Sequence, residues 1–262
     1  MNINTPLLKK IDQYLNAVPR PNCDVVEVPP FTIFFRRDSE MTEITYARPT
    51  SPLVGELTKA FTEVKAEFAK RKRTCRWEFI EDLFPTLPAL LLKHGFAEPI
   101  TRPLLAVTRD TFICESNSDI EIIKIGKAEA SVVDKVVGAS FGDEDVDPNE
   151  PIDMESGYLL GMIDRGCSAY AAKIDGRIVG GGVHSPVDDT TELAGIGVLP
   201  AYRRRGVAGA LSAALVADAF ERGCECVFLS AADEAVQRVY ARIGFVRIGV
   251  AMDSTELVEG WA

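Results

Sequence analysis

Two stretches of the chain end with the same pattern, and this repetition constrains the fold more than any other feature. In residues 90–108, a leucine-rich segment stops at Gly95-Phe96 and a β-rich run follows. In residues 239–255, an amphipathic segment stops at Gly244-Phe245, and a β-rich run follows again. Glycine commonly ends helices, so each stretch predicts a helix, a stop and a strand. The repetition indicates two modules of the same α/β type.

The elements expected before these endings follow one order in both halves: strand, strand, helix, strand, helix, strand. The polar segment 111–119 lies between them, which predicts a boundary near residue 115 and domains at 1–115 and 116–262. In the first half we expect helices at 6–16, 51 or 52 to about 70, and 84–93, and strands at 30–37, 43–49, 74–80 and 102–108. In the second half we expect helices at 128–139, 204–222 and 234–242, and a short helix that ends near residue 164. The strands expected there are 120–126, 168–174, 177–184, 191–199, 226–231 and 245–252. Asp175-Gly176 suits the tight turn of a hairpin. The fold class expected is α/β with mixed, twisted sheets flanked by helices.

The composition is that of a globular protein: 262 residues, of which 47% are hydrophobic and 26% charged. No apolar run reaches the ~18 residues of a membrane span, and the charged N-terminus has no secretory h-region. We therefore expect a cytoplasmic protein with no membrane partner. Six cysteines without a CxxC pair and only two histidines argue against a disulfide scaffold and a metal site.

Charge divides the chain unevenly. Residues 1–110 carry 16 basic and 14 acidic side chains, whereas residues 111–262 carry 13 basic and 25 acidic ones. An acidic half repels nucleic acid, so no nucleic-acid partner is expected. The acidic segment 143–155 would suit a cationic acceptor, although a solvated loop explains it equally well.

The most informative segment is GVLPAYRRRGVAGAL at 197–211, where a strand gives way to a basic loop and a helix. Pro200 ends strand pairing, and Gly206 lets the backbone approach an anion closely. Free N–H groups and the dipole at the helix start, together with three arginines, favour a pyrophosphate. A Walker A loop is excluded because Gly-Lys-Ser/Thr is absent, and a Rossmann fingerprint fails because proline stands at 200.

The run from Arg203 to Ala208 resembles the Q/R-x-x-G-x-G/A motif of the GCN5-related N-acetyltransferase (GNAT) family. The surrounding strands and helices resemble that family in order and spacing over roughly residues 119–255. The resemblance implies acetyl-CoA as the acyl donor and direct transfer, in a ternary complex, to a primary amine of a small molecule or peptide. It also implies an acyl-CoA site at Ile196, Gly197, Val198, Arg203, Arg204, Arg205, Gly206, Val207, Ala208, Gly209 and Asp233.

Two residues are expected to carry the chemistry. Tyr240 stands where the family keeps a tyrosine beside the CoA sulfur, and a phenol can protonate a leaving thiolate. Glu192 lies eleven residues before Arg203, the separation at which some members carry a general-base glutamate. It is expected to share a strand face with Ala194, Ile196 and Val198. A water relay is the alternative base. Asp233 replaces an asparagine common in the family, and we favour for it the role of a helix N-cap.

The first half contains no basic glycine loop before its long helix, so it is expected not to bind CoA. It resembles the degenerate N-terminal half of tandem members of the family. Alternative functions are a non-catalytic acyl-CoA-binding sensor or interaction protein, and an acyltransferase that uses a longer acyl chain. The assembly is expected to be a monomer or a homodimer.

Overall fold

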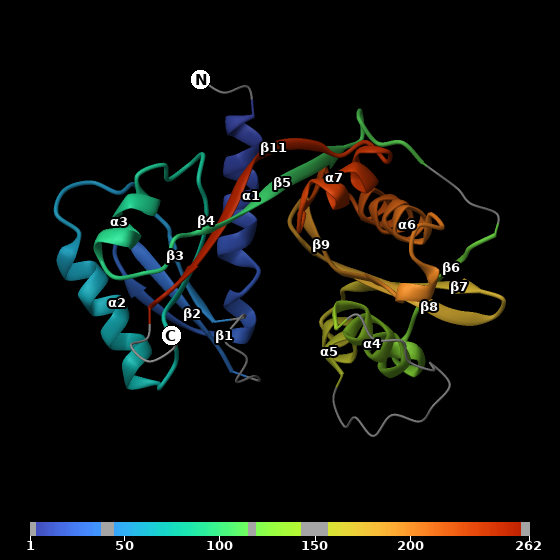
Figure 1. The fold of residues 1–262 in the computed structure, drawn as a ribbon, viewed down its shortest axis with the longest axis horizontal. Helices are drawn as coiled ribbons and strands as arrows, with labels where there is room; N and C mark the ends of the chain where they lie inside the picture. Colours follow the sequence, from blue (N-terminus) through green and yellow to red (C-terminus); the bar gives the residue numbers. More distant parts are fainter. Residues whose placement is uncertain (1–3, 38–44, 115–118, 143–156, 258–262) are drawn as a thin grey trace. The chain divides into compact units, whose positions relative to one another are not determined.

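The computed structural model describes residues 4–37, 45–114, 119–142 and 157–257. The chain divides into two compact units (Figure 1): unit 1 comprises Met1–Leu104 with Ile248–Ala262, and unit 2 comprises Leu105–Arg247. Within the described ranges we find no helix with the length and apolar character that a membrane crossing requires.

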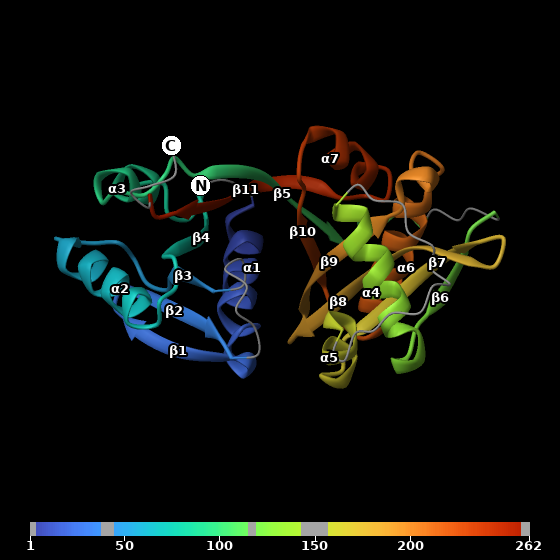
Figure 2. The same cartoon turned by 60° about the horizontal axis from the view of Figure 1, so that its bottom comes forward.

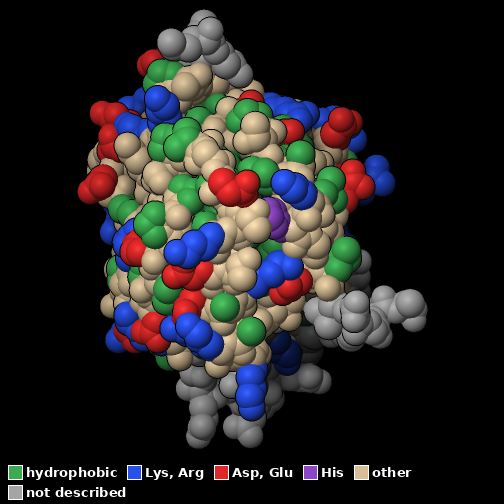
Figure 3. All heavy atoms as spheres, turned by 90° about the vertical axis from the view of Figure 1, so that its left-hand side faces the viewer, with side chains coloured by type: hydrophobic (Ala, Val, Ile, Leu, Met, Phe, Trp, Pro, Cys, Tyr) green, Lys and Arg blue, Asp and Glu red, His purple; other side chains and the backbone are tan. Residues whose placement is uncertain are grey.

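Unit 1 is a sheet with the strand order β1-β2-β3-β4-β11. Its elements are α1 (Thr5–Ala17), η1 (Arg20–Asn22), β1 (Cys23–Val28), β2 (Phe31–Arg36), β3 (Tyr46–Pro49), α2 (Thr58–Lys70), β4 (Arg76–Ile80), α3 (Leu87–Lys93) and most of β11 (Val246–Thr255). β3 and β4 run parallel, while the other neighbouring strands run antiparallel. Aromatic side chains fill the core, with Phe31 edge-on to Trp77 at 4.7 Å between ring centroids. Figure 3 shows both charge signs mixed over its α2 side, in keeping with the nearly balanced charge of the first half.

Unit 2 is a sheet with the strand order β5-β10-β9-β8-β7-β6. Its elements are β5 (Ile100–Thr108, from Leu105 onward), β6 (Glu121–Lys124), α4 (Lys127–Phe141), α5 (Tyr158–Asp164), β7 (Ser168–Ile174), β8 (Arg177–Val187), β9 (Thr190–Val198), η3 (Pro200–Tyr202), α6 (Val207–Glu221), β10 (Cys226–Ser230) and α7 (Glu234–Ala241). Figures 1 and 2 show α4 and α5 on one face of this sheet and α6 on the other. The expected mixed sheets flanked by helices are confirmed.

The two halves of the sequence repeat one order of elements. β1-β2-β3-α2-β4-α3-β5 in the first half corresponds to β7-β8-β9-α6-β10-α7-β11 in the second. The final strands are exchanged, however. β11 pairs with β4 of unit 1, and β5 lies next to β10 of unit 2. The compact units therefore differ from the expected division at residue 115, because each takes its last strand from the other half of the sequence.

Most expected elements are present, with local differences. The helix expected from Ser51 or Pro52 begins only at Thr58, because Gly55 has a φ of +75°, which a right-handed helix excludes. β1 was not expected. The Asp175-Gly176 turn is confirmed, with positive φ at both residues. The acidic segment 143–155 lies outside the described residues, as does the start of the strand expected at 43–49.

Candidate functional site

Unit 2 contains a pocket of about 400 Å³ at the carboxyl end of β9. It is bounded by the last residues of β9, the loop that follows, the first turn of α6, the end of α4, and α7. The pocket brings together most of the site residues expected from the sequence: Ile196, Gly197, Val198, Arg203, Arg204, Gly206, Val207, Ala208, Gly209 and Tyr240. Glu192, Arg205 and Asp233 are not among the residues that line it.

The pocket opens where two parallel strands separate. β9 and β10 pair from Thr190 and Cys226 as far as Glu192 and Phe228, and the register ends there. Beyond Glu192, β9 continues to Val198 along the pocket wall. Its N–H and C=O groups on the β10 side can therefore bond an extended ligand in the manner of an added strand.

A β-bulge shapes this wall. In the pairing of β8 with β9, Gly181 faces Gly197 and Val183 faces Ala194, so β9 holds one extra residue in that interval. Gly195 lies inside it with a φ of +60°, a conformation that favours glycine. The extra residue bends the strand and shifts, by one residue, the alternation of side chains between the two faces of the sheet.

The bulge overturns one expectation. Ala194 packs with hydrophobic residues of α4, whereas Ile196 and Val198 pack with hydrophobic residues of α6. Glu192 and Ala194 therefore do not share a face with Ile196 and Val198, as strict alternation predicted. Since Leu193 packs on the α6 side, its neighbour Glu192 belongs to the α4 side.

The loop before α6 forms a positive helix start. Gly206 caps the helix in the left-handed conformation, with a φ of +84°. Ala210 donates the first backbone hydrogen bond of the helix, to the Gly206 carbonyl oxygen at 3.0 Å. Three backbone N–H groups come earlier in the helix than this first donor, and they have no carbonyl acceptor within the helix: those of Val207, Ala208 and Gly209. This arrangement is suited to binding the oxygens of a phosphate or pyrophosphate.

The three arginines of the loop have different surroundings. The Arg203 guanidinium donates to the Ser140 carbonyl at 2.6 Å and to the Val198 carbonyl at 3.2 Å, so it joins the end of α4 to the end of β9. The Arg205 guanidinium lies 5.5 Å from the ring centroid of Tyr202. Arg204 lines the pocket. Arg203 thus shapes the loop, and Arg204 contributes positive charge to the pocket itself.

Tyr240 reaches the pocket from α7. Its side chain is only 7% exposed and packs edge-on against Phe245 at 5.5 Å. Burial raises the pKa of Tyr240 to about 12, so the phenol is protonated at neutral pH. A buried, neutral phenol beside a pocket can donate a proton or a hydrogen bond to a group that gains negative charge.

Glu192 and Asp233 lie at the margin of the site. Glu192 is half-buried at the point where β9 and β10 separate, opposite Ser185 of β8 and Phe228 of β10. The Asp233 carboxylate accepts a hydrogen bond of 2.8 Å from the Val236 N–H, which makes it the N-cap of α7. The capping role that we favoured from the sequence is therefore the one observed.

Six further residues line the pocket that the sequence did not predict: Ser140, Phe141, Tyr202, Val236, Val239 and Arg242. The spacing of Val236, Val239 and Tyr240 along one helix face was a signal that could have identified the α7 wall. Ser140 and Phe141 carry no comparable signal, because only the tertiary packing of α4 against β9 brings them to the site.

The one histidine of unit 2 takes a structural place. His184 is fully buried on β8, and its Nε2 lies 2.8 Å from a carboxylate oxygen of Asp218 on α6. The other oxygen of Asp218 accepts from Lys124 at 2.6 Å and from the Tyr170 hydroxyl at 3.0 Å. None of these residues lines the pocket, so the cluster ties α6 to the sheet. Across the described part of the chain, His, Cys, Asp and Glu side chains form no group suited to a metal ion.

Comparisons with known proteins agree with this geometry. Residues 137–245 match the family model described as "Acetyltransferase (GNAT) family". The fold is similar to that of a GCN5-related N-acetyltransferase from Kribbella flavida, with 22% identity, a TM-score of 0.78, and 98% of this chain and 97% of that chain covered. It is also similar to a GCN5-related N-acetyltransferase from Sphaerobacter thermophilus (16% identity, TM-score 0.66, 87% and 76% covered). A tandem GNAT protein from the clavulanic acid biosynthesis pathway is similar too (14% identity, TM-score 0.58, 86% and 77% covered). No curated protein sequence matches the chain.

Proposed function

We propose that the chain, whose residues 137–245 match the model of the GNAT acetyltransferase family, transfers an acetyl group from acetyl-CoA to a primary amine. The acceptor we propose is a small molecule or the amine of a peptide. The observation that carries the proposal is the single pocket wall that combines a positive helix start, an unpaired strand edge and a buried phenol.

The residues of this pocket fit acyl-CoA. The N–H groups at 207–209 and the charge of Arg204 suit the pyrophosphate, and the free edge of β9 suits the amide-containing arm. The bound donor supplies an activated thioester. Arg203 contributes indirectly, since its bonds to Ser140 and Val198 fix the loop that presents those N–H groups.

We assign the proton transfers to two residues on opposite sides of the opening between β9 and β10. Glu192, on the α4 side, takes a proton from the acceptor ammonium, directly or through water. The amine nitrogen then bonds to the acetyl carbon as the carbon–sulfur bond breaks, and the nitrogen gives its second proton to water, which leaves the amide. Tyr240, on the α7 side, gives its proton to the leaving thiolate and regains one from water. The transfer is direct, in a ternary complex.

For unit 1 we propose a degenerate GNAT-like domain that does not bind CoA. The repeated order of elements supports a common origin, and the absence of arginines from the segment between β3 and α2 supports the loss of the donor site. The acidity of residues 111–262 favours a cationic acceptor. A monomeric or homodimeric state and a cytoplasmic location remain predictions.

A non-catalytic acyl-CoA sensor is the second candidate, favoured by the position of Glu192 outside the pocket lining. Kinetics with Tyr240→Phe separates the two functions. Thiol release from acetyl-CoA is measured with spermidine, lysine and an aminoglycoside as acceptors, and acetyl-CoA affinity is measured by calorimetry. We expect turnover to fall by about 100-fold in Tyr240→Phe and by about tenfold in Glu192→Gln, with acetyl-CoA affinity within about twofold of wild type.

Tyr158→Phe is the matched control, since it removes the same hydroxyl from an exposed tyrosine on α5. Unchanged turnover in Tyr240→Phe removes the proposed acid. Unchanged turnover in Glu192→Gln leaves the water relay as the base. Acetyl-CoA binding by the wild type without turnover on any acceptor identifies the sensor.

A further inference from the structure

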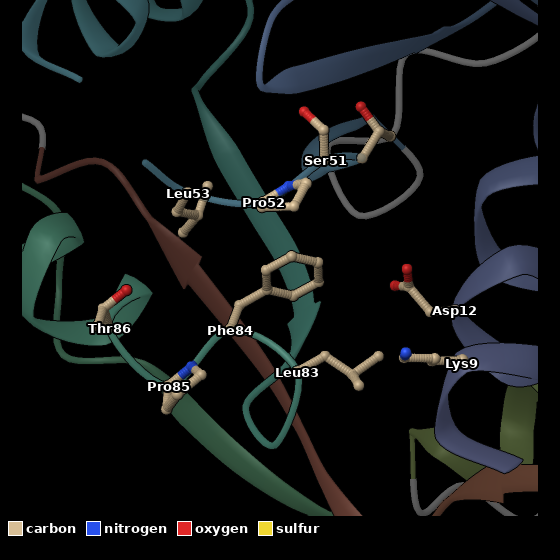
Figure 4. Close-up of a pocket in the computed structure, with 10 residues that line it drawn as sticks. Lys9, Asp12, Ser51, Pro52, Leu53, Leu83, Phe84, Pro85 and Thr86 are labelled. Atoms are coloured by element: carbon tan, nitrogen blue, oxygen red, sulfur yellow. The ribbon is translucent and has the colours of Figure 1, made fainter. Parts of the chain in front are cut away.

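Unit 1 has a pocket of its own, of about 420 Å³, beside the carboxyl ends of β3 and β4. Residues 50–53 follow β3, residues 83–86 follow β4, and Lys9 with Asp12 of α1 faces them across the pocket (Figure 4). Within the described residues the register of these two parallel strands comprises one pair, Ala47 and Trp77, so the strands separate early. Ligands of α/β proteins commonly bind in such openings at the ends of parallel strands.

The position of this pocket matches that of the acyl-CoA pocket within the repeat. In unit 2 the walls are the end of β9, the segment beyond β10 and the helix α4; in unit 1 they are the end of β3, the segment beyond β4 and the helix α1. The loop chemistry differs, because no arginine stands between β3 and α2. The pocket is therefore retained without the groups that would suit a pyrophosphate.

Two charged side chains line this pocket, Lys9 and Asp12. Both oxygens of the Asp12 carboxylate are engaged, one by the buried guanidinium of Arg48 at 2.8 Å and the other by the Asn16 amide at 3.3 Å. Asp82 precedes the lining residue Leu83 but lies outside the lining, and it keeps its negative charge because the Val250 N–H that it accepts from, at 2.9 Å, is neutral. Within the described residues, the ammonium of Lys9 forms no ion pair. Lys9 is thus the charged side chain of the lining that has no counter-ion, and it lies on the α1 side of the pocket.

The rest of the pocket is mainly apolar. Figure 4 shows the ring of Phe84 and the side chain of Leu83 between α1 and the loop that carries Pro52 and Leu53. Leu53, Leu83 and Phe84 are half-buried, so each leaves apolar surface that a ligand can cover. A cation at one side and an apolar surface beside it suit a ligand with a carboxylate head and an apolar body.

We propose that unit 1 binds a small monocarboxylate with an aryl or alkyl body, its carboxylate on Lys9 and its body against Leu83 and Phe84. An amine ligand is disfavoured, because Asp12 is already neutralised by Arg48. This site is separate from the acetyl-CoA pocket of unit 2, and its existence does not depend on the proposed acetyl transfer.

Binding of phenylacetate to the full chain tests the proposal. Calorimetry and saturation-transfer NMR compare phenylacetate with phenylacetamide, which lacks the charge, and with phenethylamine, which reverses it. We expect phenylacetate to bind with a Kd of about 1 mM or tighter, and the other two compounds to bind at least about fivefold more weakly. Lys9→Met should weaken phenylacetate binding by about fivefold, because it removes the charge and keeps most of the side-chain volume.

Lys59→Met is the matched control, since it makes the same change on exposed α2 outside the pocket, and it should bind as the wild type does. Leu53→Trp fills the pocket and should abolish binding, with thermal unfolding as the check on folding. The proposal is overturned by no phenylacetate signal at about 10 mM. It is equally overturned by phenethylamine binding as tightly as phenylacetate, or by Lys9→Met binding as the wild type does.

Discussion

The two units share an architecture but differ in the few residues to which we assign the acetyl transfer. Both halves of the sequence follow the order of three strands, helix, strand, helix and strand, and each unit has a pocket beside the ends of a parallel strand pair. Four residues before the shared Gly-Phe stop, unit 2 has Tyr240 and the first half has Leu91. Leu91 is fully buried in the aromatic core and offers no proton. The repeated fold thus preserves a pocket, whereas the proposed acetyl transfer also needs the loop before α6 and the Tyr240 phenol.

Exchange of the last strands qualifies this comparison, because the halves of the sequence are not the folded units. A fragment 1–115 loses the part of β11 that pairs with β4, including Met252 of the aromatic core. A fragment 116–262 loses Leu105 and Val107, both fully buried in the main cluster of unit 2. Each buried side chain contributes about 1.5–3 kcal/mol, a large share of the stability of a small domain. We expect both fragments to lack cooperative unfolding by near-ultraviolet circular dichroism.

Fragment 105–247 is the control for that experiment. It keeps the buried residues of β5 and omits only the residues that belong to unit 1. We expect it to unfold cooperatively and to bind acetyl-CoA. Cooperative unfolding of both 1–115 and 116–262 would contradict the strand exchange and restore a simple division near residue 115.

A pair of glycine substitutions tests whether the loop before α6 binds acetyl-CoA in a way that the loop before α2 does not. Gly206 and Gly55 both have positive φ and both precede a helix, one in each unit. Gly206→Glu places a side chain and a negative charge at the start of α6, so acetyl-CoA affinity should fall by about 100-fold in calorimetry. Gly55→Glu carries similar backbone strain, but its added Cβ meets open space, and affinity should stay within about twofold. Equal losses of acetyl-CoA affinity in both variants would mean that backbone strain, and not a disrupted phosphate site, weakens binding.

Local sequence spacing was enough to predict the central part of the site. The strand, basic loop and helix at 197–211 place their groups together through chain neighbours alone, and Tyr240 follows from its distance to Gly244. Asp233 as an N-cap is equally local. These features were predicted because a short stretch of backbone determines where they lie.

Features that depend on distant partners could not be predicted in this way. The bulge at Gly195 inverts the faces of β9, and only the pairing with β8 reveals the extra residue. Ser140 and Phe141 reach the pocket through packing of α4, and the exchange of β5 and β11 leaves no periodic mark in the sequence. Hydrophobic alternation describes which residues a strand buries, but not which strand lies beside it.

The two histidines of the chain lie one in each unit. The smallest difference that we expect between the units is how strongly each histidine makes the free energy of unfolding depend on pH. Burial lowers the pKa of His184, which is fully inaccessible, and burial also lowers the pKa of His94, which stacks on Phe61 while remaining partly exposed. A folded-state pKa below the unfolded value of 6.5 means that the unfolded chain binds the proton first as pH falls. The stabilisation that comes from keeping each histidine neutral is therefore fully present above about pH 7 and is lost as the pH falls below 6.5.

We expect the free energy of unfolding, measured with urea, to fall by about 1 kcal/mol between pH 7.5 and 5.5 through His184. His184→Gln should remove most of that pH dependence, since glutamine can still donate to Asp218 but does not titrate in this range. His94→Gln should remove less, because solvent reaches the His94 ring. Asp218 does not interfere, because hydrogen bonds from Lys124, His184 and Tyr170 outweigh its burial and hold its pKa below 3.8, outside this window. If His94→Gln instead removed the larger share, the desolvated histidine would lie in unit 1, and the buried cluster under α6 would not hold its histidine neutral.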